Sequence, residues 1–285
     1  MLEEAPILSD KARGLDWQAR LRSSLGHCFP QIAETLTGSA RELELQFQLV
    51  KAGARAVSLK VMASGYSGFI KVFDGVDGTE CYGRERGTLL AMSDSGLVPD
   101  VLAYSDELQF VLTEWVWQDH GLEQDPCRVA SVIGSWMARF DAAAPSEPAS
   151  GNWLGYLSKI KTGLDHGPIG DMKDALVDIP LCGRVLSRND AAFHNYIWSR
   201  DGSVLGCDFE QARMRPRGWD YIMGFSALIE RFPDNISDVL TAYSEGFARS
   251  HRGSLIVEEL NAVARVLFCA RAVAGQRHEE VASWQ

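Results

Sequence analysis

The sequence predicts a two-lobed α+β fold, with an N-terminal lobe built on an antiparallel sheet and a mostly helical C-terminal lobe. From Glu42 to Phe73 hydrophobic and polar residues alternate, which is the period of half-buried strands. After Trp117 apolar residues recur at three- and four-residue spacing, which is typical of amphipathic helices. The 285 residues are enough for two lobes, and 46% of them are hydrophobic. We place the boundary so that residues 1–116 form the first lobe and residues 117–285 the second.

The N-terminal lobe is expected to contain three strands, a helix and two further strands, in that order. Gly53 and the pair Ser64–Gly65 supply turns that divide the alternating stretch into an antiparallel meander. A helical pattern, ERGTLLAM, follows, and the apolar and aromatic run LQFVLTEWVW predicts the last strand. One or two helices between Leu15 and Leu36 are expected to lead into this lobe.

The C-terminal lobe is expected to be carried by one early helix and three late ones. The early helix, RVASVIGSWMARFDAA, is closed by Pro145 and Pro148. Residues 146–170 are rich in Gly and Ser and predict an excursion over the surface. The late helices are predicted at 222–232, 236–250 and 255–275.

Composition argues against several classes of protein. Because 38 acidic residues outnumber 28 Lys and Arg, the net charge is −10, which disfavours a nucleic-acid partner and favours a cationic or neutral substrate. The N-terminal segment is acidic and polar, and no run approaches the roughly 20 apolar residues of a membrane span. We therefore expect a soluble, cytoplasmic protein without a membrane partner. The six cysteines show no metal or disulfide spacing and are expected to be free thiols: Cys28, Cys81, Cys127, Cys182, Cys207 and Cys269.

The most informative stretch is VLSRNDAAFHNYIWSRDGSVLGCDFEQA, residues 185–212. It places Asp190 five positions before Asn195, then a hairpin with Asp201–Gly202 at its turn, then Asp208 at the end of the returning strand. An Asn and an Asp supply the oxygen ligands that Mg²⁺ takes, while Asp190 can accept a proton. Each residue alone is equally explained as an ordinary turn residue. The ordered set is what predicts phosphoryl transfer, with Asp190 as base.

On these motifs the chain resembles the aminoglycoside phosphotransferase and choline kinase superfamily, small-molecule relatives of the protein kinases, from about Phe47 to Gly224. The resemblance implies a bilobal, protein-kinase-like fold and an ATP- or GTP-dependent enzyme that uses Mg²⁺. It assigns Asn195 and Asp208 to the metal. Asp220, in RGWD, matches an Asp that braces the catalytic loop through its backbone.

The resemblance extends to the nucleotide. Lys71, in GFIKV, matches the Lys that contacts the α and β phosphates, and Glu85 matches its acidic partner, with Glu80 as the competitor. Gly53 lies in the turn that takes the place of the nucleotide-binding loop. In TEWV, the carbonyl of Glu114 and the amide of Val116 match the hinge that binds adenine, although a buried edge strand explains these residues equally well.

Arg188 departs from the family pattern, because the family has a His at this position of the loop. We give Arg188 a structural role, which its guanidinium could fulfil by pairing with a nearby carboxylate. His194 is also unusual, and we treat it as structural rather than catalytic.

The acceptor is expected to be a small hydroxylated molecule bound by the C-terminal lobe. Carboxylates and a Trp follow the hinge and would suit an amine, although a solvated acidic face explains each of them singly. These residues are Trp117, Asp119, His120, Glu123, Asp125 and, on a late helix, Glu245. Acceptors consistent with the resemblance are aminoglycosides or other antibiotics, choline- or ethanolamine-like amino alcohols, and sugars; the sequence does not indicate the oligomeric state.

Two other functions compete with a small-molecule kinase. A non-catalytic nucleotide-binding or scaffold protein on the same fold is suggested by Arg188 and the single glycine of the nucleotide loop. A protein kinase is disfavoured, because no activation segment with an Ala-Pro-Glu-like end follows Asp208.

Overall fold

The computed structural model describes residues 32, 35, 45–63, 65–74, 77–119, 121, 125–159, 173–251, 253 and 255–274. The chain divides into two compact units. The first comprises Met1–Tyr82 and Asp100–Trp115, and the second Gly83–Pro99 and Val116–Gln285. The lobe boundary predicted from the sequence, between residues 116 and 117, stays a prediction. In the division of the structure into two units, most of the helix that follows the third strand belongs to the second unit.

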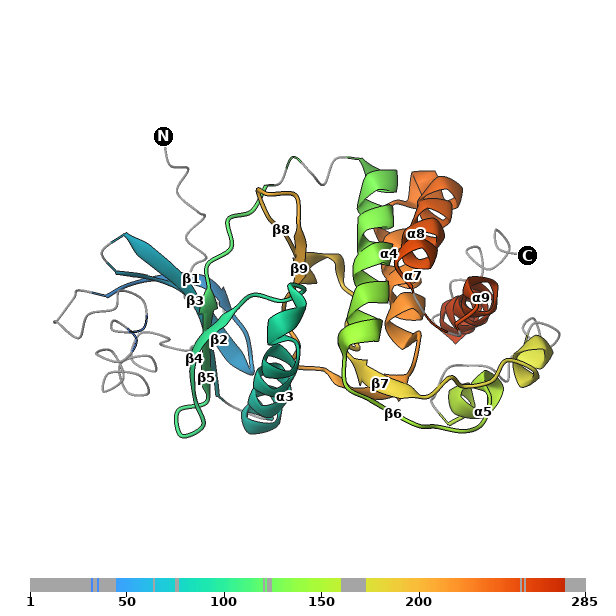
Figure 1. Cartoon of the computed structure of the whole chain (residues 1–285), viewed down its shortest axis with the longest axis horizontal. Coiled ribbons are helices and arrows are strands. Elements are labelled where there is room, and N and C mark those ends of the chain that lie inside the picture. Colours follow the sequence, from blue (N-terminus) through green and yellow to red (C-terminus); the bar gives the residue numbers. More distant parts are fainter. Residues whose placement is uncertain are drawn as a thin grey trace. The chain divides into compact units, whose positions relative to one another are not determined.

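The first unit is built on a five-stranded antiparallel sheet with the order β1-β2-β3-β5-β4 (Figure 1). Its strands are β1 (Gln46–Ala52), β2 (Ala56–Ala63), β3 (Tyr66–Phe73), β4 (Val101–Ser105) and β5 (Phe110–Glu114). The predicted turns join the first three strands, because Gly53 donates its N–H to the carbonyl of Ala56 at 2.8 Å and Gly65 has a φ of 86°. The predicted meander and strand order are therefore confirmed.

One face of this sheet carries the core of the first unit. The side chains that alternate along the central strands are buried there, together with Ile32. They are Val57, Leu59, Val61, Ile70, Val72, Phe110 and Leu112. The helices expected between Leu15 and Leu36 lie almost wholly outside the described residues.

Helices dominate the second unit. They are α4 (Pro126–Ala143), α5 (Trp153–Leu157), α7 (Trp219–Arg231), α8 (Ile236–Ser250) and α9 (Val257–Ala274). The helix α3 (Gly78–Ala91) begins in the first unit and continues into the second, and short 3-10 helices lie at 93–95, 175–177, 193–195 and 233–235. The early and late helices thus form where the periodicity predicts them. Asp125 caps α4 by accepting from the N–H groups of Cys127 and Arg128.

Two small antiparallel sheets in the second unit position the candidate site. One has the order β10-β7-β6, formed by Arg213–Pro216, Arg184–Ser187 and Ser146–Glu147. The other pairs β8 (Tyr196–Trp198) with β9 (Val204–Gly206). The turn of this hairpin contains Asp201 and Gly202, as predicted. The returning strand ends at Gly206, so Asp208 lies two residues beyond it rather than at its end.

Aromatic side chains form much of the core of the second unit. The Trp136 ring stacks on Phe140 with centroids 4.9 Å apart, and Phe140 stacks on Phe209 at 5.8 Å. Tyr196 meets Trp136 edge to face at 5.3 Å. This aromatic cluster joins α4 to β8 and to the segment that follows β9, and its rings lie against the guanidinium of Arg188, two residues before Asp190.

Candidate active site

The loop after β7 is held to the start of α7 by the carboxylate of Asp220. This carboxylate accepts from Ser187 Oγ at 2.7 Å, from the N–H of Arg188 at 2.9 Å and from the N–H of Asn189 at 3.1 Å. Burial raises the pKa of Asp220, and the Ser187 hydrogen bond, the Arg188 charge and the loop amides oppose that rise. The contacts that the resemblance assigned to Asp220 are thus present in the structure, while a catalytic function of the loop stays a prediction.

Asp190 has one anchored and one available carboxylate oxygen. Its Oδ1 accepts from the N–H of Ala192 at 3.0 Å, which forms a turn closed by the side chain. Its second oxygen makes no hydrogen bond with any described residue, and the side chain is partly exposed. The preceding Asn189 has a φ of 59°, a left-handed conformation that Asn tolerates better than most residues. This geometry holds the Asp190 carboxylate in place yet leaves an oxygen for a ligand.

Asn195 and Asp208 are brought together by the β8–β9 hairpin. The N–H of Cys207 donates to the carbonyl of Asn195 at 2.9 Å, so the residue next to Asp208 is bonded directly to Asn195. Asp208 adopts a left-handed φ of 63°. Asn195 is 1% exposed, and its Nδ2 has no hydrogen-bond partner. A buried N–H donor without an acceptor is costly unless a ligand satisfies it, and a phosphate oxygen could accept from Nδ2, whereas Mg²⁺ would bind the oxygen of the same side chain.

Arg188 lies underneath this pair of residues. Its Nη2 donates to the carbonyls of Asn195 at 3.2 Å and Cys207 at 3.0 Å, and the side chain is fully buried. The guanidinium carbon is 5.3, 4.4 and 5.6 Å from the ring centroids of Trp136, Tyr196 and Phe209. The sequence suggested a carboxylate partner, whereas the hydrogen bonds of this guanidinium go to two backbone carbonyls. Arg188 therefore binds the backbone of Asn195 and of Cys207, the residue before Asp208, with one buried cation.

The residues predicted to contact nucleotide are divided between the two units. Lys71 is buried on β3 with its Nζ 5.0 Å from the Phe73 ring centroid, and Glu114 ends β5 with its N–H donating to the carbonyl of Asp100. Glu85 is 5% exposed on α3, whereas the competing Glu80 is exposed. The pairing of Lys71 with Glu85, the role of Gly53 and the adenine contacts of Glu114 and Val116 stay predictions.

The residues predicted to bind a cationic acceptor have local partners instead. Asp119 accepts from the N–H of Gly121, Asp125 caps α4, and Glu245 pairs with Arg249 at 3.8 Å. Trp117 is exposed, but the Arg200 guanidinium already lies 5.3 Å from its ring centroid. His120 and Glu123 lie outside the described residues, and His194 is exposed. The partners of these three carboxylates are close to them in sequence and lie outside the loop of Asp190.

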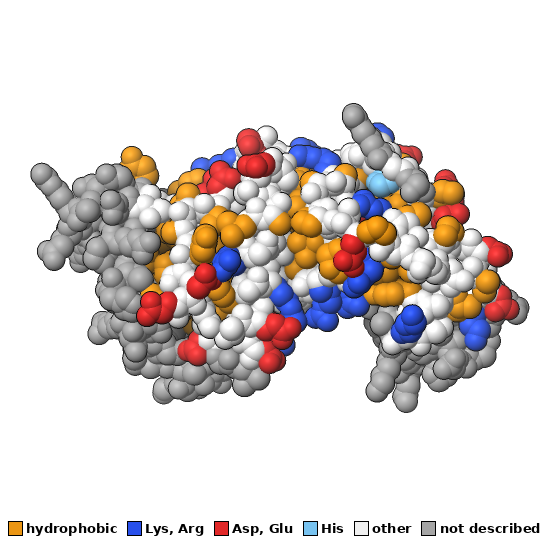
Figure 2. All heavy atoms as spheres, turned by 60° about the horizontal axis from the view of Figure 1, so that its bottom comes forward, with side chains coloured by type: hydrophobic (Ala, Val, Ile, Leu, Met, Phe, Trp, Pro, Cys, Tyr) orange, Lys and Arg blue, Asp and Glu red, His pale blue; other side chains and the backbone are white. Residues whose placement is uncertain are grey.

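Basic side chains, which the sequence analysis did not single out, lie beside that loop. Arg215 donates from Nε to the side-chain oxygen of Asn189 at 2.8 Å. The Arg231 guanidinium is 5.4 Å from the Phe193 ring centroid. Figure 2 shows Lys and Arg side chains gathered on the face that comes forward from the lower side of Figure 1, where β6 and β7 lie. The run RMRPR at 213–217 is the sequence signal for this group of basic side chains, but the net charge of the whole chain, which is acidic, gives no indication of it.

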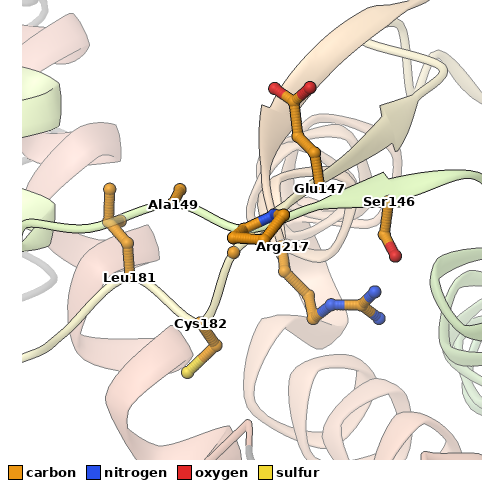
Figure 3. A pocket seen from close by; sticks show the side chains of 8 residues that line it. Ser146, Glu147, Ala149, Leu181, Cys182 and Arg217 are labelled. Atoms are coloured by element: carbon orange, nitrogen blue, oxygen red, sulfur yellow. The ribbon is translucent and has the colours of Figure 1, made fainter.

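A pocket of about 400 Å³ lies at the start of β7 and contains none of these loop residues. It is lined by Ser146, Glu147, Pro148, Ala149, Leu181, Cys182, Gly183 and Arg217. Figure 3 shows the Glu147 carboxylate and the Arg217 guanidinium pointing in different directions. The guanidinium pairs with Asp141 at 2.6 Å, so its charge is already compensated. We assign this pocket no part in the predicted chemistry.

The described residues limit how a metal could be held. They contain no group of three or more His, Cys, Asp and Glu side chains placed to bind a metal ion. A magnesium site would accordingly need Asn195 and Asp208 together with oxygens of a bound phosphate. The five cysteines that the structure describes are free, and none of the helices within the described ranges is long and apolar enough to cross a membrane.

Comparison with known proteins identifies the fold. No family model and no curated protein matches the sequence. Among solved structures, the macrolide 2′-phosphotransferase of Brachybacterium faecium is 16% identical, with a TM-score of 0.54 over 92% of this chain and 96% of that one. The choline kinase of Streptococcus pneumoniae is 14% identical, with a TM-score of 0.51 over 92% of both chains. The Plasmodium vivax ethanolamine kinase is 12% identical, with a TM-score of 0.56 over 91% of this chain and 81% of that one.

The chain thus has the bilobal, protein-kinase-like α+β fold of the aminoglycoside phosphotransferase and choline kinase superfamily. The resemblance seen in the sequence motifs is confirmed at the level of the fold. At these identities the likeness identifies no activity, so the function has to be argued from the site.

Proposed function

We propose that this protein is an ATP-dependent O-phosphotransferase that acts on a hydroxyl group of a small molecule. The observations that support the proposal lie in the second unit, where Asp190 keeps an available oxygen and the segments of Asn195 and Asp208 are hydrogen-bonded to each other. Phosphoryl transfer depends mainly on positioning and on charge neutralisation, and this loop supplies groups for both.

Asp190 would orient the acceptor hydroxyl and take its proton. The hydroxyl oxygen forms a bond to the γ-phosphorus, the bond from that phosphorus to the β–γ bridging oxygen breaks, and ADP leaves with the electron pair. Asn195 and Asp208 would hold Mg²⁺, which when bound neutralises charge on the phosphate oxygens. Arg188 holds the carbonyls of Asn195 and of Cys207, which precedes Asp208, and Asp220 holds the backbone before Asp190.

The nucleotide contacts follow from the resemblance. Lys71, with Glu85 as partner, would contact the α and β phosphates, and the turn at Gly53 would lie over them. The carbonyl of Glu114 and the amide of Val116 would bind the adenine, or the guanine if GTP is the donor. The free thiols of the described cysteines suit the cytoplasm, where we expect the enzyme to act.

The acceptor is proposed only as a class. The similar structures are named for macrolide, choline and ethanolamine substrates, and one further structure for spectinomycin, so this fold serves chemically different alcohols. An antibiotic, an amino alcohol or a sugar is compatible with the fold. A non-catalytic nucleotide-binding protein is the alternative of another class.

Asp190→Asn tests the base directly. The Asn side chain keeps an oxygen for the Ala192 N–H but cannot accept a proton, so turnover should fall by about 10²- to 10⁴-fold. Nucleotide binding should stay within about twofold of the wild type. ADP release is measured during a screen of hydroxylated amines, sugars, acids and antibiotics, and nucleotide affinity is measured by calorimetry.

Asp201→Asn is the matched control, because Asp201 likewise accepts from the N–H two residues on, at 2.8 Å, in an exposed turn. Unchanged turnover in Asp190→Asn would remove Asp190 from the mechanism. If the wild type binds no nucleotide in the presence of Mg²⁺, the catalytic proposal is wrong and the non-catalytic alternative needs a ligand other than a nucleotide.

A further inference from the structure

Two arginines contact residues that neighbour the proposed base in the loop. Arg215, on β10, is hydrogen-bonded to the side chain of Asn189, the residue before Asp190. Arg231, at the end of α7, lies over the ring of Phe193, three residues after Asp190. Neither arginine is needed to hold magnesium or nucleotide in the proposed mechanism. Both are therefore available to act on the acceptor.

Arg215 is held rigidly and still has donors to offer. Its Nε is bonded to Asn189, its Nη1 donates to Tyr156 Oη at 2.9 Å, and its guanidinium carbon is 5.4 Å from the Trp219 ring centroid. Its Nη2 has no hydrogen bond with the part of the chain that the structure describes. A guanidinium fixed by two hydrogen bonds and a ring loses little freedom when it binds a further group.

Arg231 carries a charge that no carboxylate of the described residues neutralises. Its guanidinium carbon is 5.4 Å from the Phe193 centroid and 5.5 Å from the Phe232 centroid. It forms no ion pair within the described ranges, although Glu230 and Asp234 are close in sequence and exposed. Two aromatic rings thus orient an exposed cation without neutralising it.

Among the described residues, the acidic side chains that would favour a cationic acceptor have other partners. Asp125 caps a helix, Glu245 pairs with Arg249, and the face of Trp117 is occupied by Arg200. Arg215 on β10 and Arg231 at the end of α7 therefore each place a positive charge beside a residue that neighbours Asp190 in the loop. A quaternary ammonium or protonated amine placed there would be repelled, whereas an anion would be attracted.

We propose that the acceptor carries an anionic oxygen group, a carboxylate or a phosphate, which Arg215 and Arg231 bind while its hydroxyl lies at Asp190. The inference rests on the proposed function and names the substrate class of that site. Planar guanidinium groups suit such anions because they donate two parallel hydrogen bonds. Arg215, which is fixed, would set the orientation, and Arg231, which is exposed, would close on the anion from the other side of the base.

The test measures binding of small probes to protein saturated with Mg²⁺ and a non-hydrolysable ATP analogue. The probes are L-malate for a carboxylate, inorganic phosphate for a phosphate, ethanolamine for a cation and glycerol for a neutral alcohol, each titrated by calorimetry. We expect malate or phosphate to bind the wild type, and whichever binds identifies the anion. Ethanolamine and glycerol should bind at least tenfold more weakly.

Arg231→Gln should raise the Kd of the anionic probe at least tenfold, and because this side chain is exposed the variant is expected to fold. Arg215→Lys keeps the positive charge but loses the paired N–H donors of the guanidinium. It should raise the Kd of the anionic probe by a smaller factor. Arg249→Gln is the control, since Arg249 is also exposed, at 63%, and lies on α8. Its anion affinity should equal that of the wild type.

The proposal is overturned if neither anion binds, if Arg231→Gln and Arg215→Lys both bind the anion as tightly as the wild type, or if ethanolamine binds most tightly. These outcomes need no turnover. A protein that binds the anion through both arginines but never releases ADP would contradict the proposed phosphotransferase and leave the anion site standing.

Discussion

At the scale of single residues, Arg188 is the most unusual feature of the site. Burying a guanidinium costs several kcal/mol in desolvation unless hydrogen bonds and opposite charge offset it, as roughly estimated for ions in proteins. Here two carbonyls accept from Nη2, three aromatic rings surround the cation, and Asp220 lies close enough for its charge to be felt. Its Nε and Nη1 have no hydrogen-bond partner. The energetic cost of burying Arg188 is explained if this side chain is needed to position the backbone of Asn195 and Cys207.

Replacing Arg188 with Met tests this positioning role. Met fills much of the same space without donors, so the Asn195 and Cys207 carbonyls lose the Arg188 hydrogen bonds and the Asn195 carbonyl keeps only the Cys207 N–H. The predicted metal ligands Asn195 and Asp208 would then be held less firmly. The Mg²⁺ concentration required for nucleotide binding should rise about 10- to 100-fold, the range seen when residues behind metal ligands are replaced. It is measured by calorimetry of ATP binding over a series of Mg²⁺ concentrations.

Arg200→Met is the control, because Arg200 also lies over a ring but is exposed. A purely structural role predicts a lower melting temperature for Arg188→Met with an unchanged Mg²⁺ requirement, and that result would contradict the positioning role.

At the scale of secondary-structure elements, α4 and α8 approach each other closely through two glycines. A Cβ on Gly134 would collide with the carbonyl oxygen of Tyr243, and a Cβ on Gly246 with that of Ser131. In both cases the obstacle is backbone, which cannot move aside as the end of a flexible side chain can. These glycines accordingly set the distance between the two helices on which the aromatic core of the second unit is built.

Gly246→Ala should lower stability although Ala is the better helix former. The helix propensity gain is about 1 kcal/mol, whereas overpacking costs typically ~1–3 kcal/mol and more against backbone. We expect a melting temperature lower by several degrees, measured by circular dichroism. Gly87→Ala in α3 is the matched control, since its new Cβ would meet nothing within 4 Å and the change should be neutral or stabilising. A rise in stability in both variants would show that the helices can move apart freely.

The elements also show how far the sequence alone could lead. The strands, the β8–β9 hairpin and the four long helices of the second unit follow from periodicity and turn residues, because those signals are local. Asp190, Asn195 and Asp208 could be picked out because their chemistry and order form a recognisable set. The two hydrogen bonds of Arg188 could not be foreseen, because their acceptors are backbone carbonyls that any residue supplies. The need for glycine at positions 134 and 246 could not be predicted either, because the backbone that each glycine approaches lies more than a hundred positions away in the sequence.

At the scale of the whole molecule, the net charge does not describe the charge at each place on the surface. The net charge of −10 favoured a cationic or neutral acceptor, yet two of the side chains that contact neighbours of Asp190 in the loop are arginines, Arg215 and Arg231. The field at a site depends on the nearest uncompensated charges, because screening at physiological salt weakens exposed charges beyond about 8 Å. The acidic surplus is thus better understood as a property of the general surface, which favours solubility.

The last prediction concerns the stability of the whole chain in the presence of nucleotide. A ligand that binds only the folded protein adds about 2.7 kcal/mol of stability at a hundredfold excess over its Kd. ATP with Mg²⁺ should therefore raise the melting temperature by several degrees, and chelation of Mg²⁺ should remove most of the rise. Lys71→Met in the first unit and Asp208→Ala in the second should each abolish it if both residues contact one bound nucleotide. Asp201→Ala, in an exposed turn, should keep the full shift. A shift that persists in Asp208→Ala but disappears in Lys71→Met would mean that nucleotide binds without the metal pair, and the role given to Asn195 and Asp208 would then have to be withdrawn.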